Sequence, residues 1–156
     1  MTGPVRIRRV GPEAAATVVR LVDQLLAELG EEGDETGTLD TRKMKVAWAL
    51  REERHCAFLA HDESGEAIGV ATVATAFALY ARGDYGIINE MWVEPAWRSR
   101  KVGAQLVEAV AAYGRERGWR RIDVTAPESE RWERTRRFYE DCGYSFTGPK
   151  LKILID

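Results

Sequence analysis

The stretch MWVEPAWRSRKVGAQLVEAV, residues 91–110, is the most informative segment of this chain. Its first residues read as the end of an apolar strand, and Pro95 bends the chain away from that strand. From Val102 onward, apolar residues recur every three or four positions, which predicts an amphipathic helix. A strand that passes through a short basic loop into a helix is typical of the α/β class, in which helices cover both faces of a sheet.

The loop between this strand and this helix predicts an anion site. Arg98, Arg100 and Lys101 lie in the loop or at its end. The first turn of a helix has backbone N–H groups without helical partners and carries the positive end of the helix dipole. Gly103 lets phosphate oxygens approach the backbone, and Ala104 is nearly as permissive. A pyrophosphate fits such a site best, although the alternative is that these charges are simply solvated.

Length and charge limit the remaining choices. The 156 residues predict one domain, residues 1–156, and the 45% hydrophobic content is enough for a core. There are 23 basic and 25 acidic residues and a net charge of -2, so we expect no nucleic-acid partner. The longest nearly uncharged run, residues 67–81, is too short and too polar for a membrane span.

Cysteine usage and the first residues indicate the compartment. Cys56 and Cys142 are the only cysteines, and neither belongs to a paired metal-binding motif, so we expect no metal. The opening residues show no secretion signal. These observations predict a reduced, cytoplasmic protein.

Hydrophobic periodicity and turn residues outline the other elements. The strands are expected at 5–10, 55–62, 67–81, 85–94 and 119–125, followed by a terminal hairpin of 144–146 and 150–154. The helices are expected at 12–30, around 44–50, at 101–117 and at 129–142. The strand–helix–strand unit of residues 85–125 should form a right-handed parallel crossover. This order favours a mixed sheet with helices on both faces.

Two motifs resemble those of the GNAT superfamily of N-acetyltransferases. Motif A of that family is usually written R/Q-x-x-G-x-G/A after a strand. The matching residues here are Val93, Pro95, Arg98, Val102 and Gly103. Lys101 stands at the position of the family's first glycine.

The second motif is RRFYEDCGYSF, residues 136–146, which resembles motif B of the same family. Phe138, Tyr139, Gly143 and Tyr144 match that motif at its spacing. The asparagine that often precedes the Phe-Tyr pair in the family is Trp132 in this chain.

The resemblance implies a GNAT-like mixed, mostly antiparallel sheet of six to seven strands, with splayed central strands and helices on both faces. It also implies acetyl-coenzyme A as co-substrate, with the pantetheine arm pairing with strand backbone in the gap. The residues expected to contact the coenzyme are Met91, Trp92, Val93, Arg98, Ser99, Arg100, Lys101, Val102, Gly103, Ala104, Phe138 and Tyr139.

Acetyl transfer to an amine needs a base and an acid. An ammonium group cannot attack a thioester, so Glu90 is the candidate base, either directly or through a water. Strand alternation sends Glu90 and Asn89 to opposite faces unless a bulge intervenes, and Asn89 is an alternative for orienting the amine. A buried salt bridge is the other interpretation of Glu90. Tyr139 is the candidate acid for the leaving thiolate, and simple packing beside Phe138 is its alternative.

The acceptor is suggested by an acidic segment. The residues concerned are Glu28, Glu31, Glu32, Asp34 and Glu35. Their charge favours a cationic amine such as a polyamine, an aminoglycoside-like antibiotic or a lysine side chain, unless they serve only solubility. We expect Asn89, Glu31 and Trp48 to contact the acceptor.

Two other functions stay open at this point. A catalytically silent GNAT-fold module that senses coenzyme A or binds a protein is one, because Lys101 and Trp132 depart from the motifs. RNA binding by the basic residues of the 129–142 helix is the other, although RNA-recognition motifs are missing. The sequence also leaves open whether the chain forms a homodimer.

Overall fold

The computed structural model describes residues 3–30, 37–52, 54–125, 130–148 and 150–155, apart from the side chains of 130–132. The chain forms two compact units, Met1–Val124 and Thr125–Asp156. The first unit holds the sheet and the motif A segment, and the second holds the motif B segment.

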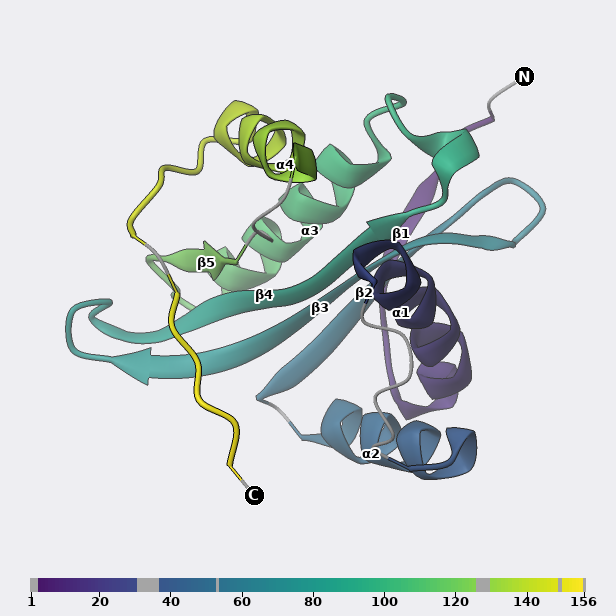
Figure 1. The fold of residues 1–156 in the computed structure, drawn as a ribbon, viewed down its shortest axis with the longest axis horizontal. Helices are drawn as coiled ribbons and strands as arrows, with labels where there is room; N and C mark the ends of the chain where they lie inside the picture. Colours follow the sequence, from purple (N-terminus) through teal and green to yellow (C-terminus); the bar gives the residue numbers. More distant parts are fainter. Residues whose placement is uncertain (1–2, 31–36, 53, 126–129, 149, 156) are drawn as a thin grey trace. The chain divides into compact units, whose positions relative to one another are not determined.

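The first unit is built on one sheet, which has five strands in the described part of the chain (Figure 1). The strands are β1 (Arg6–Val10), β2 (His55–His61), β3 (Ala67–Ala78), β4 (Gly83–Val93) and β5 (Ile122–Val124), and they lie in sequence order. Neighbouring strands are antiparallel except β4 and β5, which are parallel. The expected mixed, mostly antiparallel sheet is confirmed.

Helices cover both faces of this sheet. They are η1 (Pro12–Ala14), α1 (Ala15–Leu29), α2 (Leu39–Arg51), η2 (Pro95–Trp97) and α3 (Val102–Glu116). Figure 1 shows α1 and α2 on one side of the sheet and α3 on the other. The helix α3 connects the parallel strands β4 and β5, as expected for a crossover unit.

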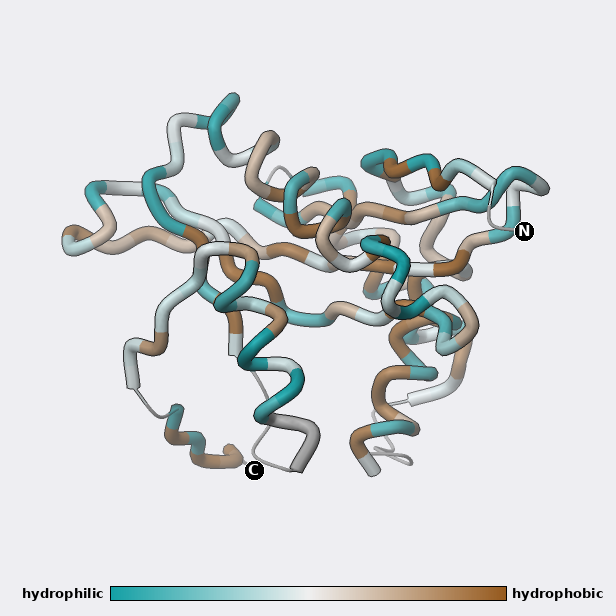
Figure 2. Tube along the Cα trace, turned by 90° about the horizontal axis from the view of Figure 1, so that it is seen from above, coloured by the Kyte–Doolittle hydropathy of each residue, from teal (hydrophilic) through white to brown (hydrophobic). Residues whose placement is uncertain are grey.

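Each face has its own apolar core. Val102, Leu106 and Val110 recur at fourfold spacing along α3 and are fully buried against the sheet. On the other face, Val18 and Leu21 of α1 fill the second core. In Figure 2, brown and teal segments alternate along the helices, as amphipathic helices require. The apolar periodicity predicted from the sequence therefore identifies the side of each helix that packs on the sheet.

The second unit contains the helix α4 (Glu130–Asp141). The expected terminal hairpin is wrong, because no strand is assigned in the described residues after α4, and the described sheet has five strands rather than six to seven. Ile153, Leu154 and Ile155 are each more than 80% exposed, and Figure 2 shows a brown stretch just before the C-terminus.

The helices formed by the described residues fall short of what a span across a bilayer requires.

Candidate active site

The end of β4 contains a β-bulge. The β3–β4 register passes from the pair Thr72 and Glu90 directly to the pair Val73 and Ile88, so Asn89 has no partner on β3. One extra residue on one strand is the definition of a bulge, and it reverses the alternation of side chains at that point.

The bulge decides which face each side chain meets. Ile88 and Met91 both pack on the α3 side of the sheet although they are three residues apart. Trp92 packs on the α1 side. Asn89 is exposed and Glu90 is half-buried. The simple opposition of Asn89 and Glu90 expected from strand alternation is therefore interrupted at this position.

Glu90 is held by a threonine on the neighbouring strand. The Thr72 hydroxyl donates a hydrogen bond to Glu90 Oε2, and the backbone N–H of Glu90 donates to Thr72 Oγ1 at 3.2 Å. Burial raises the pKa of the Glu90 carboxyl. No described arginine or lysine forms an ion pair with it, so the salt-bridge interpretation finds no support here. A carboxylate with a raised pKa is a better proton acceptor near neutral pH.

The described pairing of β4 with β5 is short. It covers Gly86 to Ile88 and ends at the pair Ile88 and Val124, where β5 itself ends. Residues Asn89–Val93 continue β4 past this last described pair. The splay expected between the two central strands stays a prediction.

The loop after β4 prepares the start of α3. Ser99 and Lys101 both adopt the left-handed region, with φ of 62° and 64°. Lys101 is the N-cap of α3, and its side chain makes no cap hydrogen bond. The amides of Val102–Ala104 therefore lack helical partners and lie at the positive end of the helix dipole. The backbone geometry is that of an anion site, and it explains why a glycine is typical at the position of Lys101.

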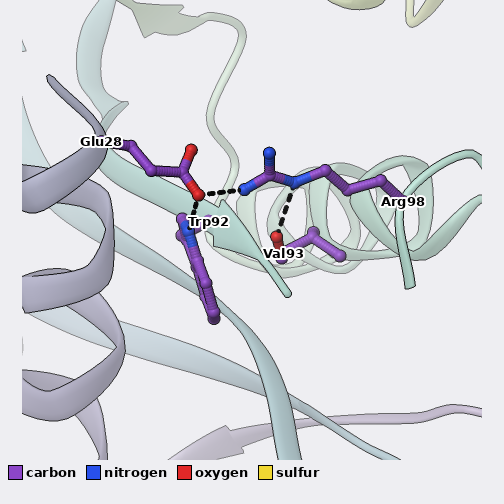
Figure 3. Close-up of polar contacts among 4 residues, drawn as sticks. All are labelled: Glu28, Trp92, Val93 and Arg98. Atoms are coloured by element: carbon purple, nitrogen blue, oxygen red, sulfur yellow. Dashed lines mark hydrogen bonds and ion pairs between the residues drawn. The ribbon is translucent and has the colours of Figure 1, made fainter. Parts of the chain in front are cut away.

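One carboxylate ties this loop to the first helix (Figure 3). Glu28 accepts a hydrogen bond from Trp92 Nε1 at 2.9 Å and another from the Arg98 guanidinium at 2.5 Å. Arg98 Nε also donates to the carbonyl oxygen of Val93 at 2.8 Å. Arg98 therefore joins the end of α1 to the end of β4.

This arrangement changes the expected role of the loop arginines. The Arg98 side chain is bonded to Val93 and Glu28, so it anchors the loop. It therefore positions the anion site, and its guanidinium group is not simply free to bind an anion. The Arg100 guanidinium lies 5.5 Å from the centre of the Trp97 ring. The backbone amides and Lys101 are thus the groups best placed to meet an anion at the start of α3.

In the second unit, an aromatic cluster surrounds Tyr139. The rings of Phe138 and Tyr144 lie 5.0 Å and 5.5 Å from the Tyr139 ring, measured between centroids. Tyr139 is buried, and burial raises the pKa of its phenol. Phe138 is half-buried. The phenol therefore stays protonated at neutral pH, as a proton donor must.

Comparison with known proteins identifies the family. The sequence model of the acetyltransferase (GNAT) family matches residues 20–144. The chain belongs to the GNAT family. It is 32% identical over 104 residues to an uncharacterized N-acetyltransferase of Archaeoglobus fulgidus, an alignment that covers 64% of this chain and 69% of the relative.

Solved structures show the same fold at low sequence identity. An aminoglycoside N-acetyltransferase in complex with coenzyme A has a TM-score of 0.80 at 18% identity, covering 99% of this chain and 97% of that one. A ribosomal-protein-alanine N-acetyltransferase of Brucella melitensis has a TM-score of 0.76 at 16% identity, covering 98% and 100%. The expectation of an acetyltransferase with acetyl-coenzyme A as donor is confirmed by family membership.

The first unit brings many of the expected site residues of this GNAT acetyltransferase into one segment. Glu90, the backbone of Met91–Val93 and the loop of residues 98–104 follow one another from the bulge to α3. Trp48 lies on an exposed side of α2 with 62% of its surface accessible. Glu31 lies outside the described residues. Among the described residues, no group of three or more His, Cys, Asp or Glu side chains is placed to hold a metal ion.

Two contacts of this acetyltransferase were not predicted from the sequence. Thr72 holds Glu90, and this pairing depends on a cross-strand register that includes the bulge. Glu28 was expected only as part of an acidic segment, whereas it bonds to Trp92 and Arg98. The one available signal was its place in the last turn of an amphipathic helix.

Proposed function

We propose that this GNAT acetyltransferase, acting as a single domain of residues 1–156, transfers an acetyl group directly from acetyl-coenzyme A to the primary amine of a small or peptidic cationic acceptor. The observation that carries the proposal is that one segment leads from the half-buried Glu90, whose pKa is raised, along the end of β4 to the bare amides of α3. One continuous segment thereby offers a base, strand backbone and an anion site.

The described residues fit the coenzyme. The amides of Val102, Gly103 and Ala104 would hold its diphosphate, with Ser99 and Lys101 shaping the loop backbone. Met91–Val93, at the end of β4, would offer backbone groups to pantetheine. When bound, the coenzyme supplies an activated acetyl thioester. One of these backbone N–H groups would polarise its carbonyl oxygen.

Glu90 is the proposed general base. Its raised pKa suits it to take a proton from an ammonium group, either directly or through a water. Thr72 fixes the carboxyl group through its hydroxyl. Asn89, exposed at the bulge, is proposed to orient the amine or that water.

Tyr139 is the proposed general acid. A coenzyme A thiolate has the pKa of an ordinary thiol, about 8.5, so a phenol that is still protonated at neutral pH can return a proton to it. Burial raises the pKa of Tyr139, which keeps the phenol protonated at neutral pH but also makes it a weaker acid toward the thiolate than an ordinary phenol. The Phe138 ring packs against this phenol and would help to fix its orientation.

The nature of the acceptor rests on charge. The acidic residues of segment 28–35, among them Glu31, favour a cationic amine. Trp48 offers an exposed aromatic surface on α2 that suits stacking with an amine or its carbon chain. A cytoplasmic location, the lack of a nucleic-acid partner and the formation of a homodimer stay predictions.

The test measures free thiol released from acetyl-coenzyme A with spermidine, an aminoglycoside and a lysine peptide as acceptors. We expect turnover with at least one of them, and losses of about 10²–10⁴ in kcat for Glu90→Gln and for Tyr139→Phe. Tyr80→Phe is the matched control, because Tyr80 is 68% exposed. Coenzyme binding without turnover would contradict the proposed reaction. Full activity of Tyr139→Phe would contradict the proposed role of Tyr139 as the acid.

A further inference from the structure

A second concave region of the first unit lies at the far end of α3. It has a volume of about 360 Å³ and is formed where β1 ends, β2 begins, and α2 and α3 finish. Its lining includes Arg9, Arg51, Glu52, His55, Tyr113 and Arg117. We refer to it as the arginine pocket. Tyr113 is eleven residues beyond Val102, which places it roughly 16 Å along the helix from the first turn.

The arginine pocket concentrates positive charge. Arg9, Arg51 and Arg117 face a single carboxylate of the described lining, Glu52. None of the three arginines forms an ion pair with a described carboxylate. Other arginines of this unit do, as in the pairs Arg115–Glu108 and Arg121–Asp123. The three guanidinium groups therefore keep their donors available to a ligand.

Two of these arginines contact the same aromatic ring. The guanidinium carbons of Arg9 and Arg117 lie 5.3 Å and 4.9 Å from the centre of the Tyr113 ring. Tyr113 is itself buried and packs edge-on against Phe58 and Trp119. A fixed ring thus orders two like charges before any ligand arrives, which lowers the entropy cost of binding an anion.

The chemistry of the pocket is suited to binding and not to covalent catalysis. Cys56 lies in its lining, but burial raises the pKa of that thiol to about 11, despite the nearby Arg9 and Arg117. A neutral thiol is a poor nucleophile. The volume lies near the lower end of the range of about 300–1,000 Å³ for small-molecule sites, which favours a metabolite over a macromolecule.

We propose that the arginine pocket binds a small multivalent oxyanion, a phosphate or polycarboxylate group of a metabolite, at a site separate from the start of α3. The inference does not depend on the acetyl-transfer reaction, because it rests on groups at the other end of the helix. Planar guanidinium groups recognise phosphate and carboxylate oxygens through paired hydrogen bonds, which is why the two anion classes share this chemistry.

The test is residue-resolved NMR with inorganic pyrophosphate and, separately, citrate as probes. We expect the amide signals of Gly11, His55 and Cys56 to shift in a saturable way with at least one probe, and a preference between the two identifies the anion class. Arg117→Ala should weaken this binding about tenfold or more, since a charged hydrogen bond is lost. Arg117→Lys should restore part of the affinity.

Matched controls separate this site from the coenzyme site and from loss of folding. Arg120→Ala removes the same charge from an exposed arginine outside the pocket lining and should leave probe affinity unchanged. Arg9→Gln, which changes the other guanidinium over the Tyr113 ring, should also weaken binding. Shifts confined to residues 98–104, equal losses in Arg120→Ala and Arg117→Ala, or no saturable shift with either probe would overturn the proposal.

Discussion

Trp119 lies so close to Gly86 and Gly114 that neither glycine has room for a methyl group. A Cβ atom at Gly114 would lie 2.7 Å from Cε3 of Trp119, and one at Gly86 would lie 2.4 Å from its Cζ3. Trp119 also packs edge-on against Tyr113. The indole ring thus fills the space between α3 and the β4 strand, and the two glycines are what lets it enter.

This contact predicts whether replacing Gly114 by alanine stabilises or destabilises the protein. Gly→Ala inside a helix usually stabilises a protein by about 0.5–1 kcal/mol. At Gly114 we expect the reverse, a loss of about 1–3 kcal/mol in the free energy of unfolding, because the indole ring must shift. Urea unfolding of Gly114→Ala measures it. Ala112→Gly, at an exposed position of the same helix, gives the intrinsic helix effect. A stabilised Gly114→Ala variant would show that the ring moves aside easily.

At the scale of an element, the start of α3 carries a residue in an unfavourable conformation. Lys101 has φ of 64° as the N-cap, a region that costs a residue with a Cβ atom about 1–2 kcal/mol. The short turn between η2 and α3 imposes this conformation, whatever side chain is present. A lysine at this position therefore adds a positive charge to the anion site, but it also introduces local backbone strain.

We accordingly expect Lys101→Gly to stabilise the protein by up to about 1 kcal/mol, since relief of strain outweighs the added flexibility of glycine. The same variant should bind coenzyme A more weakly at low salt, because it loses one positive charge beside the diphosphate amides. Thermal unfolding and calorimetry measure the two effects. Lys101→Ala keeps the strain and removes the charge, so lower stability in Lys101→Gly than in Lys101→Ala would contradict the strain argument.

At the scale of the whole molecule, Glu90 links the active site to stability. Its pKa is raised in the folded protein, so the folded state binds more protons than the unfolded state between the ordinary carboxyl pKa and the raised one. The free energy of unfolding therefore falls as pH rises through this window. The part of it that depends on Glu90 stays lost at neutral pH.

Glu90→Gln should consequently stabilise the protein more at pH 7 than at pH 4, relative to the unaltered chain. Urea unfolding at the two pH values measures the difference. Glu116→Gln, which removes an exposed carboxylate at the end of α3, controls for the general loss of charge. A gain that is equal at both pH values would show that burial of the Glu90 charge is not the cause.

The molecule also presents two basic regions at opposite ends of one helix. Bare amides and Lys101 lie at the start of α3, and the arginine pocket lies at its end. The first follows from local chain geometry and the second from four separate elements. This difference explains why motif spacing indicated the first and gave no sign of the second.

Local sequence patterns predicted most elements of the first unit, and two motifs indicated the family. Periodicities of two and of three to four residues located the strands and helices of the first unit, because each element must present an apolar side to a core. The strand–loop–helix stretch around Arg98 and Gly103 similarly indicated an anion site, since helix amides are a local property of the backbone. The terminal hairpin was wrong although residues 150–153 alternate between lysine and apolar residues, because alternation by itself supplies no partner strand.

Contacts between side chains from different elements could not be predicted from local patterns. The bulge at Asn89 and the bond from Thr72 to Glu90 depend on cross-strand register, which no local pattern fixes. The bridge from Glu28 to Arg98 and the stacking of Arg9 and Arg117 on Tyr113 join residues far apart in the chain. Such contacts form after helices and strands pack, so their physical origin is the three-dimensional arrangement of elements and not the order of residues.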